Sequence, residues 1–316
     1  MTGSVLPAPE PGAPGTPAAR PSAPEPAVAE PSVPGPPARA VRSGGGRASR
    51  VRPGVLLAAL VLAAAVLACA WPGLLAHADP TAADPVAALT PPGSEHWLGT
   101  DQLGRDVYTR VVHGARYSLL IGLGATALSV LAGLLVGLPA ALSGRIGDQV
   151  AMRAVDVLLA LPELLLALLV IAVVGPGTGN ALLAIAIAAT PGFARLVRGQ
   201  AMVVRGSEYV RAATALGVPR TAVVLRHVLP NTLGPLTVPA TLAVGTAVVS
   251  GSALSFLGLG PKAPAPEWGA MLSQGRDFLS TAWWIAVFPG AAITAAVVAI
   301  TVLGRQLHRR LEGRTP

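Results

Sequence analysis

One short stretch of the chain groups side chains that could do chemistry. Asp101, Arg105 and Asp106 lie within residues 101–106, where they could form a metal or catalytic cluster. However, an arginine between two carboxylates neutralises a cation site. Turns closed by short polar side chains and ion pairs are therefore the better interpretation.

The sequence contains none of the common catalytic motifs. No Gly-Lys pair occurs, so the phosphate-binding loop Gly-x-x-x-x-Gly-Lys-Ser/Thr is absent, as are Gly-x-Ser-x-Gly and His-Glu-x-x-His. The single cysteine, Cys69, excludes a multi-cysteine metal site and an intramolecular disulfide. We expect no catalytic residue, metal or cofactor in this chain.

The composition is that of a membrane protein. Of 316 residues, 52% are hydrophobic and 12% charged, whereas soluble domains usually carry about 25% charge. The net charge of +8 is almost entirely arginine. These arginines are scattered between apolar runs and aromatic residues are scarce, so nucleic-acid binding is not expected.

Six apolar runs are long enough to cross a membrane, which takes ~20 residues as a helix. In lipid the backbone must satisfy its own hydrogen bonds, so the fold class is an all-α membrane protein with six transmembrane helices. The runs cover residues 54–75, 118–142, 154–174, 180–195, 236–257 and 282–303. Pro191 and Arg195 are expected to shorten the fourth run. The first run could also be a signal peptide or, with Cys69, a lipoprotein signal, but it is longer than the 7–15 apolar residues of such signals.

The chain divides into four parts by composition. Residues 1–52 form a Pro-, Ala- and Arg-rich tail that we expect to be disordered, and its arginines either contact anionic lipid or simply flank the first span. Residues 53–116 hold the first span and an outside segment, 117–310 the five-helix core, and 311–316 a C-terminal tail.

The charge distribution predicts that both termini are cytoplasmic. With that orientation, 18 basic residues lie on the cytoplasmic side and 5 outside. Basic residues are enriched in cytoplasmic loops, so the opposite orientation is disfavoured. The longest cytoplasmic loop then lies between the fourth and fifth spans.

This loop predicts two short helices joined by a glycine. Residues 208–216 are good helix formers, with Ser207 as a possible N-cap. Gly217 suits a left-handed C-terminal cap, and Pro219 can open the next helix. Pro230 is expected to end or kink that second helix. The alternative is an amphipathic loop lying on the membrane surface.

The spacing within this loop resembles a known family motif. Two alanines, three residues, a glycine and a later Leu-Pro resemble the EAA loop of binding-protein-dependent ABC importer permeases. Arg211 stands where the family has glutamate, and His227 where isoleucine is common. The resemblance implies that residues 207–231 insert into a cleft of a separate ATP-binding subunit. The coupling residues it implies are Glu208, Arg211, Ala212, Ala213, Gly217 and Pro230.

Other motifs are similar to the C-type subunit of the dipeptide, oligopeptide and nickel permeases. They cover about residues 54–310 and are His96 to Val107, Met152 to Asp156, Ser255 to Gly260 and Pro264 to Gly269. The resemblance implies the type I importer architecture at the cell membrane, and partners comprising two ATP-binding subunits, a second permease and an extracytoplasmic binding protein. Glu267 and Trp268 would contact that binding protein, or their segment only turns the chain.

One acidic residue falls inside a predicted span. In a straight helix Glu163 would lie about 15 Å deeper than Arg153, where an ionised carboxylate costs roughly 2.5–3.5 kcal/mol without water or a partner. We expect it either to face the translocation path or to be a protonated or hydrogen-bonded structural residue. Asp156 is expected to pair with Arg153 or to lie among lipid headgroups. The cargo could be a peptide or nickel, and a secondary transporter without an ATPase is the remaining alternative.

Overall fold

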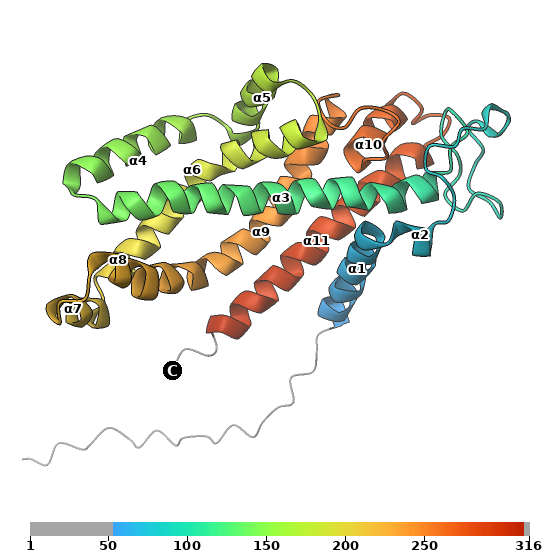
Figure 1. Cartoon of the computed structure of the whole chain (residues 1–316). Coiled ribbons are helices and arrows are strands. Elements are labelled where there is room, and N and C mark those ends of the chain that lie inside the picture. The colour runs from blue at the N-terminus through green and yellow to red at the C-terminus, as the bar shows by residue number, and fades with distance from the viewer. Residues whose placement is uncertain (1–52, 313–316) are drawn as a thin grey trace, which may run out of the picture. The chain divides into compact units, whose positions relative to one another are not determined.

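The computed structural model describes residues 53–312, with side chains through residue 309. Apart from one isolated bridge between Thr100 and Asp106, the regular elements within these residues are helices, and Figure 1 shows how they are arranged. The helices are α1 (Pro53–Ala70), α2 (Pro72–Leu75), η1 (Pro85–Ala87), α3 (Val107–Leu142), α4 (Arg145–Leu159), α5 (Glu163–Val174), α6 (Thr178–Arg205), α7 (Glu208–Ala215), α8 (Arg220–Val223), η2 (Val224–Val228), α9 (Leu229–Phe256), α10 (Trp268–Arg276) and α11 (Trp284–Glu312). The predicted tail 1–52 lies outside the described residues, and of 311–316 only the first two residues, which continue α11, are described.

Five helical segments are long and apolar enough to cross a membrane, and a bent pair of helices could make a sixth. The five are α1, α3, α6, the continuous run Arg220–Phe256 and α11. The bent pair is α4 with α5. The prediction of an all-helical membrane protein is confirmed, with five or six spans among the described residues.

The third predicted span is not one straight helix. Residues 154–174 include the end of α4 and all of α5, and the two helices meet at an angle of 91°. Pro162 precedes α5 and has no backbone N–H to continue α4. The straight-helix estimate of the depth of Glu163 is therefore wrong, because the break lies between Glu163 and Arg153.

The fourth span is longer than predicted. α6 continues through Pro191 and Arg195 and ends at Arg205. Neighbouring helices can compensate for the hydrogen bond that a proline removes in a membrane helix, so Pro191 is accommodated. The loop that follows is correspondingly short and begins at Gly206.

α3 packs closely along both α6 and α9, and glycines make this possible. A Cβ atom added at Gly137 would lie 2.3 Å from the carbonyl oxygen of Ala194 on α6. A Cβ added at Gly122 would lie 2.4 Å from the Val248 side chain on α9. Small residues commonly let membrane helices approach in this way. The packing of α3 against α6 and α9 therefore depends on glycines, which have no side chain, as much as on large apolar residues.

The short helices lie at two opposite ends of the long ones. Figure 1 shows α7 and α8 at one end and α2 and α10 at the other, with α3 running between them. This arrangement agrees with loops on two sides of a membrane. Which end faces the cytoplasm stays a prediction from the charge distribution.

Candidate functional site

The loop between α6 and α9 folds as the predicted helical elbow. α7 ends at Ala215, and Gly217 follows with a φ of 79° in the left-handed region. The Val218 N–H donates to the carbonyl of Ala213 at 3.2 Å, and Pro219 then precedes α8. The sequence predicted both the left-handed cap at Gly217 and the start of the next helix at Pro219, and both are confirmed.

The second helix of the elbow does not end at Pro230. α8 passes through one π-helical turn, η2, and continues as α9 with Pro230 in its first turn. A wide π turn changes the hydrogen-bond register and so accommodates a residue that cannot donate. The expectation that the helix ends at Pro230 is therefore wrong, whereas a kink there stays a prediction. The elbow is joined directly to a long membrane helix.

One side of the elbow packs against the end of the bundle. Val210 and Ala213 of α7 are buried together with Val228 of η2, Ala141 of α3 and Ala201 of α6. Ala213 thus faces its own chain, which corrects the expectation that it forms the partner-facing surface with Ala212. The remaining predicted coupling residues are exposed, namely Glu208, Arg211, Ala212, Gly217 and Pro230.

A large apolar side chain at the tip was missed by sequence reasoning. Leu216 is 84% exposed, directly before the left-handed glycine. Its position at the C-terminus of α7, where Val210 and Ala213 make the inward contacts, is the feature that could have indicated this exposure. Next to it, α7, α8 and the end of α3 border a pocket of about 1140 Å³ that includes Arg205, Arg211 and Arg220.

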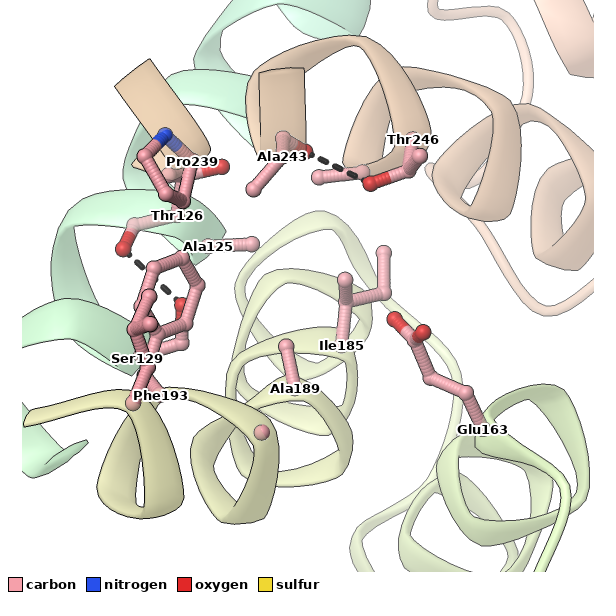
Figure 2. A pocket seen from close by; sticks show the side chains of 13 residues that line it. Ala125, Thr126, Ser129, Glu163, Ile185, Ala189, Phe193, Pro239, Ala243 and Thr246 are labelled. Atoms are coloured by element: carbon pink, nitrogen blue, oxygen red, sulfur yellow. Dashed lines mark hydrogen bonds between the residues drawn. The ribbon is translucent and has the colours of Figure 1, made fainter. Parts of the chain in front are cut away.

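A second pocket lies between the long helices, and Glu163 borders it. The pocket measures about 250 Å³ and is lined by α3, α6 and α9, with Glu163 from the start of α5. Figure 2 shows the Glu163 side chain reaching toward Ile185, with Thr126 and Ser129 on the other side of the pocket.

The polar groups of this pocket differ in how they are satisfied. Thr126 and Ser129 donate to carbonyl oxygens of their own helix at 2.8 and 2.9 Å, and Thr246 does the same at 2.9 Å. The Glu163 carboxylate makes no hydrogen bond or ion pair with the described residues. A small polar ligand would therefore find one free acid and several hydroxyls with unused acceptor capacity.

Two ion pairs join α4 to α6. Arg198 makes two bonds of 2.6 Å to the carboxylate of Asp148. Asp156 pairs with Arg195, so the expected pair with Arg153 is wrong, whereas the alternative position among lipid headgroups stays a prediction. The bend before α5 directs α4 along α6, and this brings the two acids to arginines about forty to fifty residues further along the chain.

The cluster at the start of α3 is structural, as the sequence indicated. Arg105 pairs with Asp101 at 2.7 Å and both side chains are buried. The Asp106 carboxylate accepts from the Thr109 N–H and so caps α3. His96 lies 3.1 Å from the other Asp106 oxygen.

The residues proposed to meet a binding protein are buried. Glu267 is 0% exposed, accepts a hydrogen bond from Ser118 at 2.9 Å, and caps α10 through the Ala270 N–H. Trp268 is 3% exposed and donates to the Val111 carbonyl at 2.8 Å. Neither side chain is accessible to a partner, because both hold α10 against α3.

Residues 129–315 match the family described as "Binding-protein-dependent transport system inner membrane component". The dipeptide transport system permease protein DppC of Alkalihalophilus pseudofirmus is 41% identical over 253 residues, covering 80% of this chain and 83% of the relative. The probable D,D-dipeptide transport system permease protein DdpC of Escherichia coli K12 is 40% identical over 260 residues, covering 82% and 87%. The glutathione transport system permease protein GsiD of Pectobacterium atrosepticum is 39% identical over 221 residues, covering 70% and 73%.

Two solved structures share the fold. An amino acid ABC transporter crystallised with histidines aligns with a TM-score of 0.50 at 15% identity, over 64% of this chain and 94% of that one. The methionine ABC transporter MetNI aligns with a TM-score of 0.50 at 20% identity, over 64% and 95%.

Proposed function

The chain belongs to the inner membrane components of binding-protein-dependent transport systems, and on this premise we propose that it forms, with a second permease, the path for imported peptides. It is a multi-pass transport subunit, and ATP hydrolysis is carried out by separate subunits of the system. The exposed elbow at one end of the bundle is the feature that most directly supports an ATP-driven system, since a secondary transporter has no use for it.

The assembly we propose contains two ATP-binding subunits, one further permease and an extracytoplasmic binding protein. The elbow presents Leu216, Ala212 and Arg211 outward from a base fixed by Val210 and Ala213. A rigid base with one exposed leucine suits insertion into an apolar cleft, because burying that side chain is favourable by about 1.5–3 kcal/mol. The arginines of the neighbouring pocket would pair with acidic groups at its edge.

Peptides are the cargo class that the relatives favour. The relatives named above carry dipeptide, D,D-dipeptide and glutathione transport in their names. Each of these cargoes carries an ammonium group, and the free carboxylate of Glu163 would attract it within the pocket. Nickel remains the alternative cargo, since a carboxylate attracts a divalent cation as well.

An uptake assay tests the cargo and the path together. We expect cells with the wild-type chain and its partners to accumulate labelled dipeptide and not nickel. Glu163→Gln removes the charge with little change in shape, and we expect dipeptide uptake to fall by roughly tenfold, the loss of about one charge-assisted contact of 1.5 kcal/mol. Glu95→Gln, at an exposed acid outside the spans, is the matched control. Unchanged uptake and substrate preference in Glu163→Gln would remove Glu163 from the path.

A further inference from the structure

A third pocket lies at the end of the bundle where α1 finishes. It measures about 360 Å³, within the size range of small-ligand sites (~300–1,000 Å³). It lies between α2, the first turns of α3 and the segment before α10. Its lining includes Thr81, His113, Arg116, Tyr117 and Lys262.

Two cations of this pocket have no partner in the described chain. The side chains of Arg116 and Lys262 are exposed and make no ion pair or hydrogen bond with described residues. Lys262 is the only lysine of the sequence. His113 is oriented by a 2.9 Å contact between its Nδ1 and the Thr109 carbonyl. The pocket therefore presents two unneutralised positive charges.

A third cation lies behind the pocket wall. Arg110 is 1% exposed, and its Nη1 donates to the carbonyls of Pro80 at 3.0 Å and Pro264 at 3.4 Å, two residues that line the pocket. Its Nη2 is buried with no hydrogen-bond partner. A buried donor without an acceptor is unfavourable, and this charge adds to the positive potential around the pocket.

Acidic groups near the pocket do not cancel these charges. Asp79 lies close to His113, and two hydrogen bonds from Thr81 lower the pKa of the Asp79 carboxyl below its usual value. Asp79 is therefore ionised at neutral pH but makes no ion pair with Arg116 or Lys262. Asp101 is already 2.7 Å from Arg105, and it lies 3.5 Å from Arg110.

The surroundings of the pocket are those of a membrane surface. α1 is apolar over its whole length and ends at Ala70, and the next residue, Trp71, is 65% exposed. Leu74 of α2 is also 65% exposed, and Tyr117 lies in the pocket itself. Tryptophan and tyrosine concentrate at the level of lipid headgroups. The geometry points to binding of the phosphate headgroup of an anionic phospholipid in this pocket, in the leaflet at the α2–α10 end.

Lipid retention tests this site. The purified full-length chain is placed in nanodiscs of phosphatidylcholine containing phosphatidylglycerol, and native mass spectrometry counts the phosphatidylglycerol retained after release. We expect Arg116→Gln combined with Lys262→Gln to weaken retention by roughly thirtyfold, because each basic residue near an anionic surface contributes about a fivefold gain. Arg116→Lys combined with Lys262→Arg keeps both charges and should keep binding.

Arg276→Gln is the matched control. Arg276 is an exposed cation at the same end of the bundle, paired with Asp277 at 3.1 Å, and its loss should leave retention unchanged. Equal phosphatidylglycerol retention in the double glutamine variant and the wild type, with both monodisperse, would overturn the proposal. Displacement of the lipid by inorganic phosphate alone would show a site for a soluble anion. If the double glutamine variant lost docking of the binding protein but kept phosphatidylglycerol, the pocket would be assigned to that protein. Either this result or displacement by inorganic phosphate would overturn the lipid assignment.

Discussion

Leu216→Ala should weaken the binding of the elbow to an ATP-binding subunit while leaving the stability of the chain itself almost unchanged. The side chain is 84% exposed, and α7 is held by Val210 and Ala213 instead. A substitution at such a surface position changes the free energy of unfolding by no more than about 0.5 kcal/mol. If a partner cleft buries the leucine, its removal costs about 1.5–3 kcal/mol of binding, or roughly ten- to hundredfold in affinity.

The measurement has two parts. The first is a titration of the purified ATP-binding subunits against the permease, which gives the dissociation constant. The second is ATP hydrolysis in proteoliposomes with and without the binding protein and cargo. We expect Leu216→Ala to weaken association and to reduce the stimulation by cargo. Val86→Ala is the control, since Val86 is 96% exposed in η1, at the end away from the elbow.

Ala213→Leu, in the helix that precedes Leu216, should instead lower the stability of the chain itself. Ala213 is 9% exposed and packs against its own chain. Overfilling such a site costs about 1–3 kcal/mol, so this variant should lower the thermal stability of the permease before any partner is added. An association constant for Leu216→Ala equal to that of the wild type, or a fall in stability as large as that of Ala213→Leu, would refute the orientation of the elbow argued above.

Two further predictions concern the packing of the chain. Gly137→Ala should lower thermal stability because the added Cβ would lie 2.3 Å from a backbone oxygen of α6, whereas Gly144→Ala has nothing within 4 Å and should be neutral; comparable melting temperatures for the two variants would contradict this. Asp101→Asn should cost about 3–5 kcal/mol because it leaves Arg105 buried without its partner. Asp277→Asn breaks an exposed pair and should cost no more than about 1 kcal/mol, as thermal unfolding of both variants would show.

Features that depend on neighbouring residues were predictable from the sequence. The left-handed Gly217 and the helix start after Pro219 follow from what these residues allow the backbone to do. Apolar run length likewise indicated where helices cross the membrane. The same local reasoning missed the π turn before Pro230, because a proline predicts a break and cannot reveal that the preceding turn widens to accommodate it.

Features set by distant parts of the chain were not predictable. Glu267 looked like a surface acid, yet its hydroxyl partner Ser118 lies 149 residues earlier. The 91° bend between α4 and α5 changed the surroundings of Asp156, whose partner Arg195 lies on α6. Hydropathy records that a segment is apolar and says nothing about its direction. Glu163 borders a pocket because α5 turns away from α4, and whether it faces the translocation path stays a prediction.

The continuity of α8, η2 and α9 joins the elbow to the pocket physically. The helical run Arg220–Phe256 starts in the elbow and carries Pro239, Ala243 and Thr246 along the pocket. At 1.5 Å per residue, the first of these lies about 28 Å from the start of the run. One continuous helical run connects the two sites, so a displacement at the elbow should reach the pocket walls through this run alone. The π turn lies between the two sites, and it is the place where such a helix can change register or bend.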